Sequence, residues 1–159
     1  RQAMPELGLP DLGDDPLRPL LPWLSIGRQS FEELRRAPVL PALKAMLTPA
    51  QLAALEREAP QRLRVPSGRD LALRYESGQP PILAVKIQEM FGLPETPRVA
   101  AGRVPVILHL LAPNMRPQQV TSDLASFWKN AYPVVRKELR RRYSKHPWPE
   151  DPLSANPKR

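Results

Sequence analysis

Proline is the residue that most constrains the fold of this chain. It occupies 22 of the 159 positions, against a typical share of ~5%, and the prolines are spread along the whole sequence rather than gathered in one tract. Proline ends helices and is excluded from the middle of sheets, because its φ is fixed and it lacks a backbone N–H. The spacing therefore predicts many short helices and strands with firm ends, and not a polyproline ligand.

The remaining composition is that of an ordinary globular protein. Hydrophobic residues make up 42% and charged residues 25% of a length that suits one domain or two small packed subdomains. Cysteine is absent, which excludes disulfides and thiolate sites and fits the reducing cytoplasm, where we expect the protein to reside. The longest apolar run, Val104–Ala112, is interrupted by Pro105 and His109 and is shorter than the ~18 residues that a membrane span needs. The chain starts at Arg1 without a leader, so we expect a piece of a longer protein.

Residues 1–60 are predicted to form a helical lead-in or linker. An extended entry segment with one helical turn near Pro16–Leu20 is followed by an apolar cluster. Ser30 is a candidate N-cap with acidic residues in the next turn, and Thr48 precedes a proline at a first helical position. Leucines recur at helical spacing through residues 20–58, which predicts three or four short helices. Such a bundle favours a packing or linking role over a chemical one.

The hydrophobic period changes after Pro60. Gln61–Pro66 and Arg69–Glu76 each alternate apolar and polar residues around a Ser-Gly turn, which predicts two antiparallel strands. Pro81–Phe91 returns to helical spacing, although Ile82–Val85 fits a strand equally well. The apolar Gly102–Pro113 predicts a buried central strand.

The last third of the chain predicts a strand return and an interrupted helix. Gln118–Val120 is expected to pair beside the central strand, and Thr121 or Ser122 to cap the next helix. Pro133 lies inside the helical pattern, so we expect a kink or restart near residues 130–132. Further prolines end the helix, and residues 153–159 are predicted to be a mobile tail.

The predicted fold class is therefore α+β. A short helical lead-in, residues 1–60, precedes a compact C-terminal domain, residues 61–152, with a mainly antiparallel sheet and flanking helices. A small OB-like barrel is the alternative, because short strands interrupted by one helix close in that way as well.

Positive charge is concentrated in the C-terminal part of the sequence. Residues 61–159 hold 17 of the 24 Lys and Arg but only 8 of the 16 Asp and Glu. The densest cluster lies on and just before the last predicted helix, which favours a surface that contacts nucleic-acid phosphates without reading sequence. The candidate nucleic-acid-binding residues are Lys129, Arg136, Lys137, Arg140, Arg141, Arg142 and Lys145. Neighbouring aromatic residues would serve either for base stacking or as core, and we favour the core.

The sequence offers no candidate for catalysis. It has no phosphate-binding loop of the G-x-x-x-x-G-K-[ST] type and no G-x-G-x-x-G or G-x-S-x-G motif. His109 and His146 have no partner at ligand spacing, and Glu150-Asp151 is a lone acidic pair. We therefore assign no catalytic, cofactor-binding or metal-binding residue to this chain.

Residues 77–152 resemble the C-terminal domain of the HrpB-type bacterial DEAH-box ATP-dependent RNA helicases. The most specific stretches are Leu83–Leu93, Gly102–Pro113, Gln119–Trp128 and Lys145–Pro152. The chain departs from the pattern at two positions, Arg141 in place of the usual Gly and Ser144 in place of the usual Pro. The last helix therefore ends with more positive charge and less rigidity than is usual.

The resemblance implies a parent protein that hydrolyses ATP, with magnesium, to move along or unwind RNA. Its ATPase motifs would lie outside this sequence, so no cofactor is expected in this chain. The implied role is that of an accessory domain that assists RNA binding. The alternative is a structural module that packs on the helicase core or on a partner protein whose identity is unknown.

Overall fold

The computed structural model describes residues 2–11 and 18–157. The chain divides into two compact units, Arg1–Glu58, the N-terminal unit, and Ala59–Arg159, the C-terminal unit. The division lies beside Pro60, where the hydrophobic pattern changes from helical spacing to alternation.

The described residues of the N-terminal unit form short helices. Pro5–Leu7 (η1) and Arg18–Leu20 (η2) are single 3-10 turns, and the expected turn near Pro16–Leu20 falls in part outside the described residues. The α-helices are α1 (Leu21–Ser25), α2 (Phe31–Arg35), α3 (Val39–Ala45) and α4 (Pro49–Glu58). Their lengths follow the spacing of the prolines, which the sequence predicted.

Two side chains cap these helices as expected. The Ser30 hydroxyl accepts a hydrogen bond of 3.2 Å from the backbone N–H of Glu33. Thr48 caps α4 in the same way, accepting from the N–H of Gln51 at 3.2 Å, while the Gln51 side chain accepts from the Thr48 N–H at 3.0 Å. Local chemistry therefore fixes where these helices begin.

The core of the N-terminal unit is small. Its buried apolar cluster consists of Leu20, Leu24 and Ala42. Large apolar side chains remain exposed around it, with Phe31 at 86%, Ile26 at 72% and Leu40 at 62% relative exposure. This unit leaves more large apolar surface in contact with water than it buries in that cluster.

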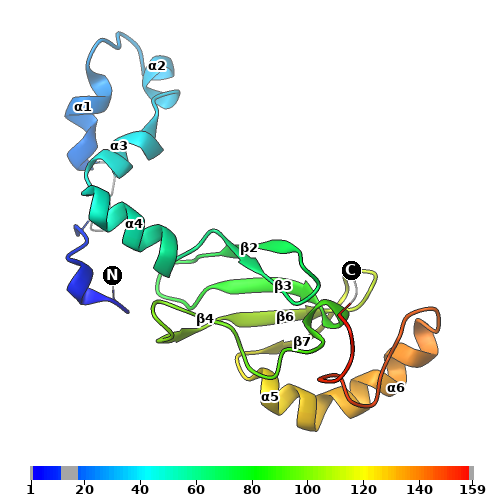
Figure 1. Ribbon diagram of the computed structural model, residues 1–159. Helices are drawn as coiled ribbons and strands as arrows, with labels where there is room; N and C mark the ends of the chain where they lie inside the picture. The colour runs from blue at the N-terminus through cyan, green and yellow to red at the C-terminus, as the bar shows by residue number, and fades with distance from the viewer. Residues whose placement is uncertain (1, 12–17, 158–159) are drawn as a thin grey trace. The chain divides into compact units, whose positions relative to one another are not determined.

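The C-terminal unit is built around an open sheet of five strands within the described residues (Figure 1). The strand order is β1-β2-β3-β6-β7, and a separate two-stranded piece pairs β4 with β5. The strands are β1 (Arg62–Arg64), β2 (Asp70–Arg74), β3 (Ile82–Lys86), β4 (Arg98–Val99), β5 (Val104–Pro105), β6 (Ile107–Leu111) and β7 (Pro117–Thr121). Because β1 and β7 are the two outer strands of the five, the sheet is not a closed barrel. The α+β prediction is confirmed, and the barrel alternative is not.

The first hairpin follows the sequence prediction. Leu63 on β1 pairs with Leu71 on β2, and Gly68 in the turn has a φ of +79°. Arg69 anchors this turn, since its Nη1 lies 2.9 Å from Oε1 of Glu89, a carboxylate whose side chain is 2% exposed. Tyr75, which directly follows β2, is 45% exposed, and its hydroxyl donates to the Pro60 carbonyl at 2.9 Å.

Of the two alternatives left open for Ile82–Val85, strand or helix, the strand is confirmed, whereas the helical spacing of the rest of Pro81–Phe91 gives only a short 3-10 turn. Residues Ile82–Lys86 form strand β3, and Ile87–Met90 form a 3-10 turn, η3, that is buried throughout. The strand is favoured because β3 lies between β2 and β6, where its backbone N–H and C=O groups form hydrogen bonds to both neighbouring strands. Gly92 follows with a φ of +83°, the left-handed conformation expected of it.

One strand pair is parallel, which an alternating pattern does not reveal. β3 pairs with β6 in parallel register from Ile82 opposite Ile107 to Lys86 opposite Leu111. The connection between them contains η3, β4 and β5, and a parallel pair requires a long crossover of this kind. β7 then returns antiparallel to β6, as predicted.

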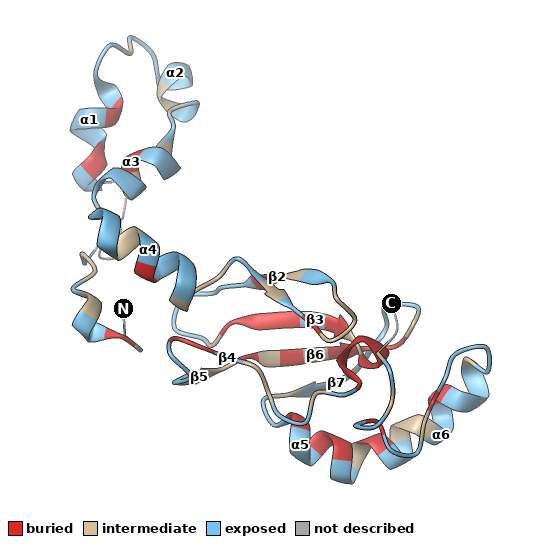
Figure 2. Cartoon of the chain, viewed as in Figure 1, coloured by how far each residue is buried: buried red, intermediate tan, exposed pale blue. Residues whose placement is uncertain are grey.

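The crossover and the C-terminal helices supply the core on one face of the sheet. Leu83, Val85, Leu108 and Leu110 are at most 1% exposed and belong to one cluster with Phe91. The buried colour along β3, much of β6 and the inner side of the helices marks this core (Figure 2). No helix of the described residues is both long and apolar enough to cross a membrane.

Candidate nucleic-acid interface

The basic residues predicted to bind nucleic acid lie on a helical segment that Pro133 reshapes. The segment starts with α5 (Leu124–Ser126), whose N-cap is Asp123 rather than the expected Thr121 or Ser122, with its Oδ1 accepting from the Ser126 N–H at 2.9 Å. Residues Phe127–Ala131 form a π-helical turn, η4, and α6 (Tyr132–Arg142) follows. The Tyr132 N–H bonds to the Phe127 carbonyl across this wider turn. The predicted disruption before Pro133 is therefore confirmed as a π-bulge.

The π-bulge brings large aromatic side chains onto one buried face. The ring centroids of Trp128 and Tyr132 are 5.3 Å apart, and both rings pack against Phe91 at 6.1 Å. Tyr132 is 0% and Trp128 6% exposed, and the Trp128 indole N–H donates to the Leu93 carbonyl at 2.8 Å. These rings are core, as favoured from the sequence, and are not available for base stacking.

A C-terminal strap, residues 145–155, fastens this helix to the crossover between β3 and β6. The Tyr132 hydroxyl donates to the Pro149 carbonyl at 3.0 Å, and the Gly92 N–H donates to the Pro152 carbonyl at 3.0 Å. Trp148 is 6% exposed, and its indole N–H donates to the Tyr143 carbonyl at 3.0 Å. The strap contains the Lys145–Pro152 stretch, so that stretch serves the packing of the fold.

Two of the seven predicted cations are held in other environments. Nε of Arg136 donates to the Trp148 carbonyl at 2.8 Å, its Nη2 lies 3.2 Å from Glu150, and the side chain is only 16% exposed. Lys129 is exposed but lines a cavity of about 450 Å³ together with Glu150 and Asp151. A hydrogen bond from the Leu153 backbone N–H lowers the pKa of Asp151. Lys129 therefore lies among carboxylates.

The other five cations form a solvent-facing basic surface, which we call the α6 basic face. Lys137, Arg140 and Arg141 are three and four residues apart, so their side chains share one side of the helix. Arg142 is the last residue of α6 and Lys145 lies beyond it, and all five residues are exposed. Among the described residues, no ion pair includes any of the five. This face offers charge and hydrogen-bond donors to phosphate groups.

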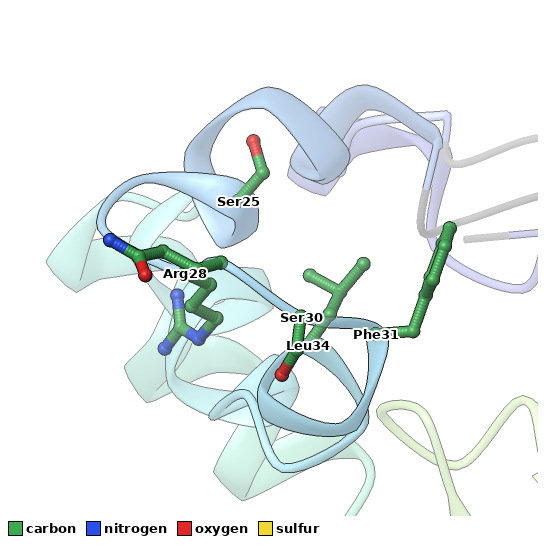
Figure 3. Close-up of a pocket in the computed structure, with 6 residues that line it drawn as sticks. Ser25, Arg28, Ser30, Phe31 and Leu34 are labelled. Carbon is green, nitrogen blue, oxygen red and sulfur yellow. The ribbon is translucent and has the colours of Figure 1, made fainter.

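No arrangement for catalysis accompanies the α6 basic face. Among the described residues, no group of three or more His, Asp or Glu side chains could hold a metal ion. His146 packs edge-on against Tyr143 with the ring centroids 6.4 Å apart, and His109 lies half-buried on β6. In the N-terminal unit, a shallow pocket of about 240 Å³ lies beside Phe31 and Leu34, with the polar groups of Ser25, Arg28 and Ser30 around it (Figure 3). The Arg28 guanidinium there donates to the Leu24 carbonyl.

The chain thus combines a compact α+β unit that carries a charged helix with a helical N-terminal unit. The chain belongs to the family described as ATP-dependent helicase C-terminal, whose model matches residues 20–152.

Relatives of known identity agree with this family. The ATP-dependent RNA helicase HrpB of Escherichia coli (strain K12) is 42% identical over 160 residues, which cover 98% of this chain and 20% of that protein. The crystal structure of the E. coli DExH-box NTPase HrpB matches with a TM-score of 0.92 at 40% identity, over 99% of this chain and 20% of that one. The crystal structure of the Escherichia coli DEAH/RHA helicase HrpB matches with a TM-score of 0.73 at 40% identity, over 92% of this chain and 19% of that one. The chain thus spans about a fifth of the length of these relatives.

Proposed function

We propose that this chain is the C-terminal accessory domain of an ATP-dependent RNA helicase and that it assists RNA binding through the α6 basic face. The observation that carries the proposal is the set of exposed cations Lys137, Arg140, Arg141, Arg142 and Lys145, which have no ion-pair partner among the described residues. The 42% identity to a protein named an RNA helicase supports RNA as the polyanion.

The proposed contacts are to the RNA backbone. Helix α6 buries its aromatic side, with Tyr132 at 0% exposure, and presents long flexible cations outward. Such a surface neutralises phosphates and releases counterions, which gives affinity that depends on salt and not on base sequence. Arg136 has a structural role in this proposal because the strap holds it.

The test measures the affinity for single-stranded RNA as a function of salt, for the wild type and for Lys137→Ala/Arg140→Ala/Arg141→Ala. Losing three phosphate contacts should flatten the slope of log affinity against log salt by ~2, at about 0.7 per single-strand phosphate. The loss should be similar for all RNA sequences.

A matched control removes three exposed cations from the N-terminal unit. Arg35→Ala/Arg36→Ala/Lys44→Ala changes the net charge equally, and the slope should stay at the wild-type value because none of these residues lies on α6. Equal effects of the two triple variants would reduce the interaction to net charge and reject the α6 basic face as the contact surface.

We assign the ATP and magnesium chemistry to the helicase part of the parent protein, which acts in the cytoplasm. The sequence contains no phosphate-binding loop, so the chain by itself should not hydrolyse ATP. Turnover by the purified chain that disappears on mutation of one of its residues would refute this assignment.

A second function, docking on the helicase core of the parent, is favoured by the N-terminal unit. Phe31, Ile26 and Leu40 are 86%, 72% and 62% exposed, and several large exposed apolar side chains in one small unit favour a surface that another part of the parent protein covers. We expect Ile26→Asp/Phe31→Asp in the full-length helicase to make its C-terminal domain cleavable by protease, while α6 variants leave the digestion unchanged. A digestion pattern identical to that of the wild type would reject docking through these residues.

A further inference from the structure

The sheet of the C-terminal unit has one face whose central part the described residues leave open, although Ile82 and Leu111 on the same face are only 8% and 7% exposed. Paired residues on neighbouring strands point to the same face of a sheet. Arg62 pairs with Ala72, Ala84 pairs with His109, and His109 pairs with Val120. Leu73 pairs with Leu83, so their neighbours Ala72 and Ala84 lie together on the other face. These pairs form one row across all five strands, here the open row: Arg62, Ala72, Ala84, His109 and Val120.

At Ala84, in the centre of the sheet, burial separates this face from the core face. Leu83 and Val85 on the middle strand β3 are 0% and 1% exposed, yet Ala84 between them is exposed. Ala72 is also exposed, Val120 is 55% exposed and His109 is half-buried. A residue on the middle strand is exposed only where nothing packs above it. The centre of the open row is therefore accessible, with the small side chains of Ala72 and Ala84 next to the His109 imidazole.

The charge on this face is mainly positive. Side chains two positions away along a strand share its face, which adds Arg64 on β1, Arg74 on β2 and Lys86 on β3 to Arg62. Asp70 is the carboxylate that β2 places on the same face, and Glu76 lies 3.3 Å from Arg74 just beyond the strand. Arg62 and Arg64 thus lie on the outer strand β1, where Arg62 is opposite Ala72, and Lys86 lies on β3 two residues from Ala84. This arrangement is complementary to a polyanion with flat uncharged groups.

The open row supplies what the α6 basic face lacks. Trp128 and Tyr132 are buried in the core, so the helix offers phosphate contacts without an exposed indole or phenol from that cluster. The His109 ring lies between Ala84 and Val120 in the open row, and the exposed Ala84 and Ala72 leave space above the sheet beside it. Bases of single-stranded RNA stack on such rings when the strand lies across a sheet, whereas a duplex keeps its bases inside.

We propose that the open row is a second RNA-binding surface, one that takes single-stranded RNA with a base against His109 and phosphates against Arg62, Arg64 and Lys86. This inference rests on the proposed RNA-binding function of the chain. The open row differs from the α6 basic face in the surface used, in the part of the RNA contacted and in the preference for single strands.

The test places a carboxylate on the open row and a matched one elsewhere. Binding of a labelled oligouridine of ~16 nucleotides is measured at fixed salt for Ala84→Glu and for Ala50→Glu, an exposed alanine in the first turn of α4. We expect at least ~tenfold weaker binding for Ala84→Glu, because the new charge opposes phosphates, and no more than ~twofold for the control. If Ala84→Glu melts at a lower temperature than the wild type, Val120→Glu on the outer strand β7 makes the same test.

His109 gives an independent readout. We expect His109→Ala to weaken single-strand binding by ~fivefold or more, and His109→Phe to retain it because a ring remains for stacking. Both variants should bind an RNA duplex as the wild type does.

The possible results separate the two surfaces. If Ala84→Glu and Ala50→Glu change RNA binding equally, the open row is not an RNA-binding surface. A face that binds a protein partner instead would give this result. If Ala84→Glu weakens RNA binding but the α6 triple variant does not, the open row is supported as the RNA-binding surface and the α6 basic face is rejected. No binding by the wild type at ~50 mM salt, a concentration at which phosphate contacts are strong, refutes both.

Discussion

The two units of this chain contain helices capped by the same local chemistry but differ in what they bury. The N-terminal unit gathers Leu20, Leu24 and Ala42 into its cluster. The C-terminal unit unites residues from the sheet, the crossover, α6 and the strap in one cluster, with Phe91 and Tyr132 at 0% exposure. Hydrophobic burial is the main source of folding free energy. The comparison indicates that the C-terminal unit has a larger hydrophobic core to stabilise it than the N-terminal unit has.

The largest expected effect contrasts two phenylalanines, one in each unit. Phe91→Ala should lower the free energy of unfolding by ~3–5 kcal/mol, because a fully buried ring leaves a cavity. Phe31→Ala should change it by no more than ~0.5 kcal/mol, since the ring is 86% exposed. Urea unfolding of both variants measures the difference. Comparable losses of unfolding free energy in the two variants would mean that Phe31 is buried in solution and would contradict the difference between the units.

An ion pair in each unit gives the next largest contrast. Arg69→Ala should cost ~2 kcal/mol, because it removes the charged partner of the buried Glu89 carboxylate, discounted for the 44% exposure of the Arg69 side chain. Arg36→Ala removes an exposed pair with Glu32 at 3.0 Å and should cost less than ~0.5 kcal/mol. Thermal melts of the two variants at equal salt compare them, and equal melting temperatures would contradict the structural role of Glu89.

The strap adds a smaller effect with a pH signature. Tyr132→Phe should cost ~1 kcal/mol by losing the hydrogen bond to the Pro149 carbonyl. Burial raises the pKa of Tyr132 from 10.0 to about 12, opposed by the charge of Arg136. A pKa raised in the folded state favours the neutral phenol, so this stability is present below pH ~10 and is lost as the pH rises towards ~12.

Urea unfolding of the wild type and Tyr132→Phe across pH 8 to ~12 measures this dependence. Tyr75→Phe is the control, because burial also raises the pKa of Tyr75 but its side chain is 45% exposed. An equally steep loss of stability in Tyr132→Phe and the wild type would assign the dependence to other groups.

The smallest difference between the two units is expected for the loss of a helix cap, which should cost the same in each. Ser30→Ala and Asp123→Ala each remove one N-cap hydrogen bond, of 3.2 Å and 2.9 Å respectively. Each should cost ~1 kcal/mol in the unit that contains it, as followed by the loss of helical circular dichroism on heating. A much larger loss for one cap would show that it also has a tertiary role, which would sharpen the comparison of the units.

Local sequence determined much of this structure. The Ser30 and Thr48 caps, the Ser-Gly hairpin turn and the disruption before Pro133 were all predicted, because each depends on residues within one or two turns of the chain. The core position of Trp128 and Tyr132 followed from the general cost of exposing large rings. The basic cluster on the last helix was also visible, although the pattern could not show that Arg136 bonds to the strap.

Only the tertiary structure decided the features that depend on residues distant in sequence. The apolar spacing of Pro81–Phe91 suits a helix or a strand, and pairing with β2 and β6 selected the strand. The parallel register of β3 and β6 joins residues 25 positions apart, such as Ala84 and His109, and no local period encodes it. That register gathers single side chains from five strands into the open row. Local propensity sets where elements begin and end, whereas satisfying backbone hydrogen bonds and burying one common core sets how they pair.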